Sequence, residues 1–156
     1  MVAGGVLYRV VQAILDRKKP AVLADVPERL FKVATAAELA EFEKTGRIES
    51  ELDRTDGFVH LSDRTSPPKV AELFFSDCKD LHLIELKASS LAGPVEWQVA
   101  PVNSTPTVGR RPTTVHYDFS CGCVHVYGAP VSMAANVRIS KCPLGADGKH
   151  RMPTWL

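Results

Sequence analysis

The chain has 156 residues, of which 45% are hydrophobic and 24% are charged, and its net charge is +1. This balance is typical of one globular domain, and it creates no overall field that would attract nucleic acid or an anionic membrane. No apolar run approaches the roughly 20 residues that a membrane-spanning helix needs. We therefore expect a cytoplasmic protein with neither a membrane nor a nucleic acid as its partner.

Residues 1–24 stand apart because their apolar side chains recur at helical spacing. This spacing predicts an amphipathic helix with a basic C-terminal end, which Pro20 terminates. A basic amphipathic start is also typical of an organellar import signal. This segment lacks serine and contains Asp16, so we favour a helix that docks on a protein partner. The apolar stripe consists of Val6, Leu7, Val10, Val11, Ile14 and Leu15.

A strand and a helix are predicted next. Residues 29–34 (RLFKVA) have the composition of a strand. A helix follows, in which Thr35 is the N-cap, Glu38 completes a capping box and Gly46 marks the end.

A short strand and a second helix come after it. An Asp56-Gly57 turn is expected to lead into a strand over residues 58–62 (FVHLS). The second helix is expected to begin with Ser66 as its cap and Pro67 at its first position. Its buried face is predicted to consist of Val70, Leu73 and Phe74.

Strands dominate the second half of the chain. Residues 80–88 (DLHLIELKA) are almost continuously apolar, which indicates a buried, central strand. This order of elements predicts an α+β fold with a mixed or antiparallel sheet. The domain is expected over residues 25–138, followed by a polar tail at residues 139–156 in which Trp155 docks. Further strands are predicted at residues 94–100, 115–119, 123–128 and 131–139, with an exposed loop at 103–114.

Two of the predicted strands, residues 58–62 and 123–128, share a pattern. In each, aliphatic side chains alternate with polar ones, so a histidine projects from the face opposite the core. Imidazole can both donate and accept hydrogen bonds near neutral pH. The polar side chains are therefore candidates for a shared pocket; the alternative is that each histidine is a structural residue. The candidates are His60, Ser62, His125 and Tyr127.

The cysteines near His125 suggest a metal site at first sight. Cys121, Cys123 and His125 follow one another at every second residue, so on a regular strand they span about 13 Å. Ligand atoms around tetrahedral zinc lie within about 4 Å of one another. We therefore expect no metal here. We also expect no Cys121–Cys123 disulfide, because alternate Cα atoms of an extended strand lie about 6.6 Å apart, near the limit for a bridge.

Two further groups could contribute to a site. Arg110 and Arg111, in the segment GRRP, offer guanidinium groups that can clamp a phosphate, although a short basic run is more often a solvated loop. Glu96 precedes Trp97 on a predicted strand, where its carboxylate faces either a site or solvent.

The chain resembles a small family of unknown function whose fold is grouped with the ADP-ribosyltransferase-like proteins. The resemblance extends from about Leu30 to Val131. It rests on the segments LFKVATAAEL, DGFVHLS, VAELFF leading to DLHLIEL, VEW and VHVYG, of which DGFVHLS is the strongest. The resemblance implies a split, strongly bent α+β fold around a cleft.

In ADP-ribosyltransferase-like enzymes of the histidine type, a histidine binds a ribose of NAD, an aromatic ring stacks on nicotinamide and a glutamate stabilises the cationic sugar. By motif position, His60 and Ser62 match the first motif, and His125 and Tyr127 match the last. The family commonly has an acid just after the tryptophan, where this chain has Gln98, so Glu96 would have to take that role.

The resemblance thus implies a nucleotide ligand, with NAD as the cofactor and no metal. The implied activity is an NAD-dependent ADP-ribosyl transfer or a related 2′-phosphate transfer. The alternative is a non-catalytic module that binds NAD, ADP-ribose or a related ligand. The implied catalytic residues are His60, His125, Tyr127 and Glu96, and the implied ligand-binding residues are His60, Ser62 and Tyr127. Arg110 and Arg111 join the ligand-binding residues as the candidate phosphate clamp.

Overall fold

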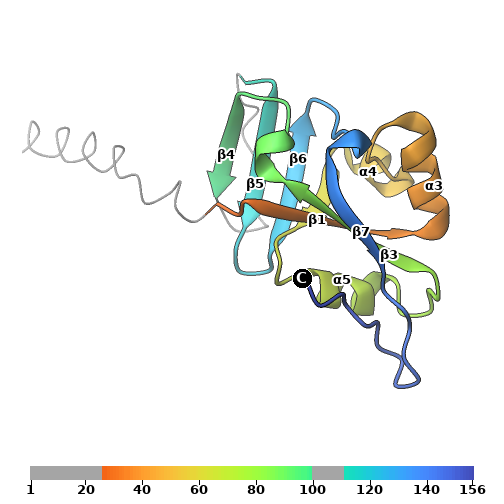
Figure 1. Ribbon diagram of the computed structural model, residues 1–156. Coiled ribbons are helices and arrows are strands. Elements are labelled where there is room, and N and C mark those ends of the chain that lie inside the picture. Colours follow the sequence, from red (N-terminus) through yellow and green to blue (C-terminus); the bar gives the residue numbers. More distant parts are fainter. Residues whose placement is uncertain (1–25, 100–110) are drawn as a thin grey trace, which may run out of the picture.

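The structure is a computed structural model that describes residues 26–99 and 111–156. Within these ranges, seven strands form one sheet in the order β4-β5-β6-β2-β1-β3-β7 (Figure 1). Neighbouring strands are antiparallel except β4 and β5, which are parallel. The predicted α+β fold with a mixed sheet is confirmed. The helix predicted within residues 1–24 and the side chain of Arg110 lie outside the described residues.

The described ranges contain seven strands, three helices and two 3₁₀ turns. No helix within the described ranges is long and apolar enough to cross a membrane. The elements are β1 (Arg29–Thr35), α3 (Ala36–Thr45), α4 (Glu51–Asp56), β2 (Val59–Ser62), α5 (Pro67–Phe74), β3 (Leu81–Lys87), the 3₁₀ turn η1 (Ala88–Ser90), β4 (Val95–Val99), β5 (Thr113–Asp118), β6 (Cys123–Gly128), the 3₁₀ turn η2 (Met133–Ala135) and β7 (Asn136–Lys141).

The sheet nearly divides between β1 and β2. Strand β1 pairs with β3 over its whole length, but its register with β2 is a single pair, Phe31 with Ser62. One part consists of β4, β5, β6 and β2, and the other of β1, β3 and β7; the two parts run in different directions (Figure 1). The main core joins them, since buried side chains of both parts, such as Ile84 and Val124, belong to one apolar cluster with Phe42 of α3. Strand β3 is interior, as predicted.

Helix caps explain where α3 and α4 begin. The predicted capping box of α3 is present, because Thr35 Oγ1 accepts from the Glu38 backbone at 3.1 Å and the Glu38 carboxylate accepts from the Thr35 backbone at 2.9 Å. The prediction that Asp56 and Gly57 form a hairpin-type turn was wrong. Asp56 is the last residue of helix α4, and Gly57 is the left-handed C-cap of that helix, with φ 80°.

The buried face of α5 also differs from the prediction. Val70 packs against the core as predicted, but Leu73 is 60% exposed and Phe74 is 72% exposed, whereas Ala71 is buried. Apolar residues occupy both sides of this helix, and the side with the small Ala71 packs against the apolar cluster that contains Phe31 of β1. A small side chain permits the closer approach of helix and sheet, so hydrophobicity alone chose the wrong side.

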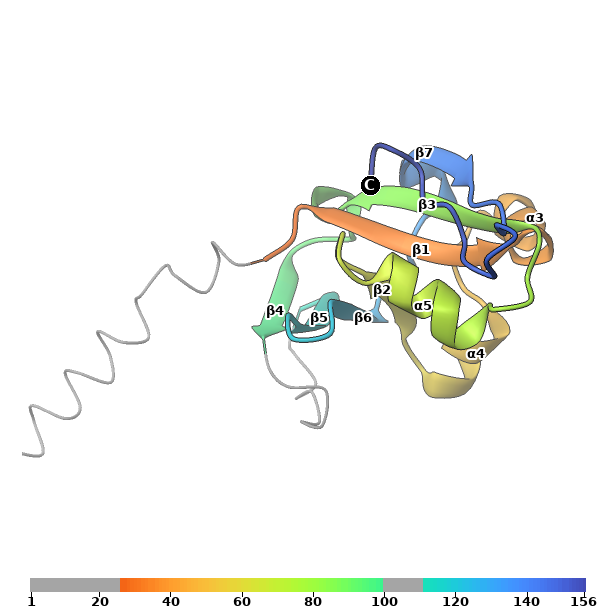
Figure 2. The ribbon, with the colours of Figure 1, turned by 90° about the horizontal axis from the view of Figure 1, so that it is seen from below.

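The last part of the chain is more closely packed than its composition indicates. The strand predicted over residues 131–139 begins only at Asn136, after η2. Trp155 docks as expected: its ring lies 6.3 Å from that of Phe31, Arg138 lies over it at 4.6 Å, and its Nε1 donates to Ser140 Oγ at 3.0 Å. The C-terminal residues therefore pack against the same apolar cluster as Ala71 of α5, and Figure 2 shows the C-terminus beside β3 and β7.

The turn between β5 and β6 corrects the cysteine prediction. Cys121 and Cys123 form a disulfide, with their Cα atoms 5.4 Å apart. The expected spacing was larger because it assumed an extended strand, whereas Cys121 lies in the turn and Gly122 adopts a left-handed φ of 71°. Cys78 and Cys142 are free thiols, as predicted.

Candidate functional site

Three histidines from neighbouring strands lie side by side. His60 of β2 is paired with His125 of β6, and His125 is paired with His116 of β5. Paired residues project from the same face of a sheet, and the ring centroids lie 5.3 Å apart for His60 and His125 and 6.3 Å apart for His125 and His116. We call this surface of β5, β6 and β2 the histidine face. The structure thus brings the two predicted histidines together and adds His116.

His116 was missed although the sequence contained a signal for it. Residues 119–122 form a short connection between β5 and β6, so Asp118 pairs with Cys123. Moving two residues away from the turn in each strand, to 116 in β5 and to 125 in β6, sets His116 opposite His125. Recognising the hairpin would therefore have predicted a third histidine on this face.

Phe58 joins the polar side chains into an aromatic cluster. Its ring centroid lies 4.5 Å from that of His60, 4.3 Å from that of His125 and 5.0 Å from that of Tyr127. All four side chains are only partly buried. Such a half-exposed group of rings can offer a stacking surface to a planar ligand, with imidazole and phenol groups as hydrogen-bond partners.

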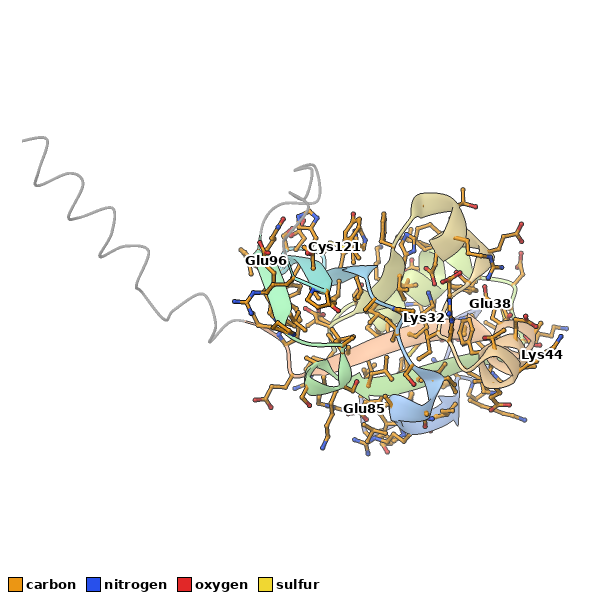
Figure 3. The ribbon with its side chains drawn as sticks, turned by 90° about the horizontal axis from the view of Figure 1, so that it is seen from above. Lys32, Glu38, Lys44, Glu85, Glu96 and Cys121 are labelled. Atoms are coloured by element: carbon orange, nitrogen blue, oxygen red, sulfur yellow. A yellow bond between two sulfur atoms is a disulfide. The ribbon has the colours of Figure 1, made fainter. Side chains whose placement is uncertain are left out.

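Asp53 of α4 holds His60 in place. The carboxylate is 2% exposed, and its Oδ1 accepts from the His60 backbone at 3.0 Å and lies 2.6 Å from His60 Nδ1. Its Oδ2 accepts from Lys32 Nζ at 2.8 Å and from the Ser50 backbone at 2.8 Å. Lys32, which reaches from β1 (Figure 3), also donates to the His60 carbonyl at 3.0 Å. This network fixes the ring orientation and directs Nε2 away from the core.

The second nitrogen of His60 faces another acid. Its Nε2 lies 3.0 Å from Asp56 Oδ2, at the C-terminal end of α4. Asp53 and Asp56 are three residues apart on one helix, so α4 presents both carboxylates to the same ring. Sequence reasoning missed both acids because it assigned Asp56 to a turn and predicted no element at Asp53. The Ser50–Asp53 capping box was the available signal.

The charges of this site follow from burial and proximity. Burial, followed by the charges of His60 and His116, lowers the pKa of His125 to about 4. Burial alone would raise the pKa of Asp53, but the hydrogen bond from His60 and the charge of Lys32 outweigh it and hold this pKa below its usual range. Burial, with a smaller effect of Asp56, raises the pKa of Tyr127. At neutral pH, Asp53 is therefore a carboxylate, His125 a neutral imidazole and Tyr127 a neutral phenol.

The other predicted site residues lie around this centre. Ser62 is buried and is paired with Cys123; it lies two residues beyond His60 on the same face of β2. Glu96 of β4 is paired with Thr114, which is paired with Tyr127, so Glu96 projects from the same face two strands away, about 10 Å from Tyr127. The Glu96 carboxylate accepts a hydrogen bond from Gln98 Nε2 at 3.3 Å. Arg111 is exposed at the start of β5.

A pocket of about 340 Å³ adjoins the aromatic cluster. Arg47, Arg54 and Phe58 line it, together with Gly128 at the end of β6. Glu49 also lines the pocket and lies 3.7 Å from Arg54 Nη1. The pocket therefore offers cationic side chains next to the rings of the histidine face. Over residues 26–99 and 111–156, no three His, Cys, Asp or Glu side chains are grouped closely enough to hold a metal ion.

Fold and site together define a small α+β protein in which a row of histidines on a bent sheet is flanked by an acidic helix. The chain belongs to the family described as Protein of unknown function (DUF952), which matches residues 33–139. The family resemblance drawn from the motifs is confirmed at this level. A comparison with curated protein sequences finds no match.

Solved structures of one bacterial protein share the fold. The crystal structure of protein CC0527 from Caulobacter crescentus is 21% identical, covers 79% of this chain and 93% of its own, and has a TM-score of 0.59. The solution NMR structure of the same protein is 23% identical, covers 78% of this chain and 90% of its own, and has a TM-score of 0.52. At this identity the likeness concerns the fold alone.

Proposed function

We propose that the histidine face binds a nucleotide that carries a planar ring and a ribose, such as NAD or ADP-ribose. The single observation that carries this proposal is the aromatic cluster, in which the Phe58 ring contacts the rings of His60, His125 and Tyr127 and all four side chains remain partly exposed. Aromatic side chains can stack on nucleobases and on nicotinamide without a specific set of polar contacts. Ribose hydroxyls suit the imidazole and phenol groups beside them.

The neighbouring charges support the same kind of ligand. The pocket next to Phe58 is lined by Arg47 and Arg54, and guanidinium groups bind phosphate oxygens in a bidentate manner. The resemblance of the sequence motifs to a family grouped with the ADP-ribosyltransferase-like proteins also implies NAD as the ligand. In the proposed complex, the rings hold the base or nicotinamide and the arginines hold the phosphates.

A transferase activity is the second candidate, and it rests on Asp56. Transfer from a ribose passes through a cationic sugar, which a nearby carboxylate stabilises. Asp56 lies 3.0 Å from His60 Nε2, whereas Asp53 is already engaged by Lys32. We therefore assign this role to Asp56 ahead of Glu96, which lies two strands from Tyr127. Without such a role the protein is a binding module.

Calorimetric titration of the full chain with NAD, ADP-ribose and NADP tests the binding proposal. Saturable heat with at least one of the three is expected, and His60→Ala is expected to weaken binding by about 10-fold or more, the equivalent of one good hydrogen bond to a ligand. His150→Ala is the matched control, because the His150 ring contacts the Cys78 carbonyl and belongs to no strand of the histidine face. This variant should bind the ligands like the parent. Absence of heat with all three ligands would remove the nucleotide proposal.

Nicotinamide release from NAD, measured by liquid chromatography, separates the two candidates. A transferase releases nicotinamide, and Asp56→Asn should then lower the rate by about 100-fold while leaving NAD affinity within a few-fold of the parent. Saturable binding without release would assign the protein to the binding modules.

A further inference from the structure

The β5–β6 turn contains a chemical group that the histidine face does not use. Cys121 and Cys123, which are separated by a single residue, form a disulfide. Cys121 is exposed and Cys123 is partly buried. Figure 3 shows Cys121 at the end of the molecule that carries Glu96, opposite Lys44 of α3.

This disulfide does little to hold the fold together. The stabilisation that a disulfide gives grows with the length of the loop it closes, and this loop contains one residue between the cysteines. Hydrogen bonds already define the turn: Gly122 donates to the Asp118 carbonyl at 2.9 Å, and Asp63 donates to the Gly122 carbonyl at 2.9 Å. A structural staple is therefore not needed at this position.

The same rigid turn keeps the two sulfur atoms close when the bond is open. The Cα separation of 5.4 Å lies within the range of roughly 4.4–6.8 Å that a disulfide spans. Asp118 further anchors the turn, because its Oδ1 accepts from the Ser120 backbone at 2.9 Å and from Ser120 Oγ at 2.6 Å. Two thiols held in this way have a high effective concentration toward each other, which favours rapid closure.

The two remaining cysteines are less suited to such chemistry, because Cys142 is buried and the half-buried Cys78 donates its Sγ hydrogen to Asp80 Oδ1 at 3.1 Å. Cys142 is buried, and burial raises the pKa of its thiol to about 11. Burial, with a contribution from Asp80, also raises the pKa of Cys78. Because the thiolate is the reactive form, both are poor nucleophiles near neutral pH. The accessible sulfur chemistry of the described chain is thus concentrated at one turn.

We propose that Cys121 and Cys123 form a reversible thiol–disulfide exchange site for a low-molecular-weight thiol such as glutathione. The thiolate of the small molecule attacks the sulfur of Cys121, the more exposed of the two residues. The bond between the two cysteines breaks, and Cys123 leaves as a thiolate that takes a proton from solvent. A second thiolate then attacks the sulfur of the bound small molecule and releases Cys121. Two thiols are oxidised to one small disulfide, and the protein disulfide gains two electrons and two protons.

The position of the site connects it with the histidine face. Cys123 is paired with Ser62 of β2 and with Asp118 of β5, and it precedes His125 by two residues on the same face of β6. Opening the disulfide frees a thiol at the edge of this face. The exchange itself does not depend on the proposed nucleotide ligand.

Equilibration of the full chain in glutathione buffers of stepped redox poise tests the site. Free thiols are trapped with N-ethylmaleimide, and the intact protein and its peptides are weighed by mass spectrometry. We expect one two-electron transition confined to the peptide with Cys121 and Cys123. Cys78 and Cys142 should remain thiols throughout.

Two variants make the result specific. Cys121→Ser should lose the transition and leave Cys123 as a thiol or a mixed disulfide with glutathione, while Cys78→Ser should keep the transition unchanged. Two outcomes would overturn the proposal: four trappable thiols at the most oxidising poise, or a Cys121–Cys123 bond that persists in the folded chain at the most reducing poise.

Discussion

At the scale of single residues, the site depends on one buried carboxylate. Asp53 satisfies Lys32, the backbone of Ser50 and both the backbone and the ring of His60. A buried ion pair need not stabilise a fold, but removing one member leaves the other charge without compensation in a medium of low polarity. Asp53 therefore links the stability of the fold to the orientation of the ring that would face a ligand.

Replacing Asp53 with Asn should lower the free energy of unfolding by about 3–5 kcal/mol, because the Lys32 ammonium stays buried without its partner. Urea denaturation followed by circular dichroism measures this. Asp147→Asn is the control, since Asp147 forms an exposed ion pair with Arg151 and its loss should have far less effect. A small and equal effect of the two substitutions would contradict the central role of Asp53.

The neutral state of His125 predicts a pH dependence. Its pKa falls from 6.5 to about 4 on folding. Between about pH 4 and pH 6.5 the unfolded chain binds more protons at this histidine than the folded chain does. The stability that neutral His125 contributes is therefore fully present above about pH 6.5 and is lost as the pH falls toward 4. The urea midpoint of unfolding should therefore fall more between about pH 7 and about pH 5 in the parent than in His125→Gln. Equal falls in both proteins would refute the shifted pKa.

At the scale of elements, the β5–β6 turn depends on a close approach. Gly122 has a φ of 71°, and a Cβ at this position would come within 2.8 Å of Thr65 Oγ1 and still closer to Asp63 Oδ1. Asp63 is itself held by the Tyr117 hydroxyl, which donates to Oδ2 at 2.8 Å. The turn thus packs directly on the segment that follows β2.

Gly122→Ala should therefore be more harmful than Gly57→Ala. Both positions have a positive φ, which costs an L-residue about 1–2 kcal/mol, but a Cβ at Gly57 meets nothing within 4 Å. At Gly122 the steric overlap adds about 1–3 kcal/mol. Thermal or urea unfolding of the two variants gives the difference, and equal losses of stability would show that the Asp63 contact is not tight.

Local chemistry predicted some elements well and others poorly. The capping box at Thr35 and the left-handed Gly46 follow from short sequence patterns, so α3 was predictable. Helix α4 has only six residues, and its Asp-Gly ending resembles a turn. The buried side of α5 is the side on which the small Ala71 packs against the sheet. The spacing of apolar residues within the helix does not predict this contact.

At the scale of the whole molecule, the bend of the sheet sets the site. Strands β2 and β1 share one register pair, so β2, β6 and β5 can turn away from β1 and β3 while the common core continues beneath them. Helix α4 contacts β2 and helix α5 contacts β1 (Figure 2). Alternation predicted which side chains leave the core, as for His60 and His125. The neighbours of these side chains depended on strand pairing across the chain, which is why His116, Asp53 and Asp56 were missed.

The most direct test of the nucleotide proposal follows the histidine rings themselves. Ring resonances of the full chain are recorded by NMR while NAD or ADP-ribose is added. Saturable shifts are expected for His60 and His125, with His150 unchanged, and the His125 shift should disappear in His60→Ala. If His60 and His125 keep their positions at high concentrations of both ligands, the histidine face does not bind these nucleotides.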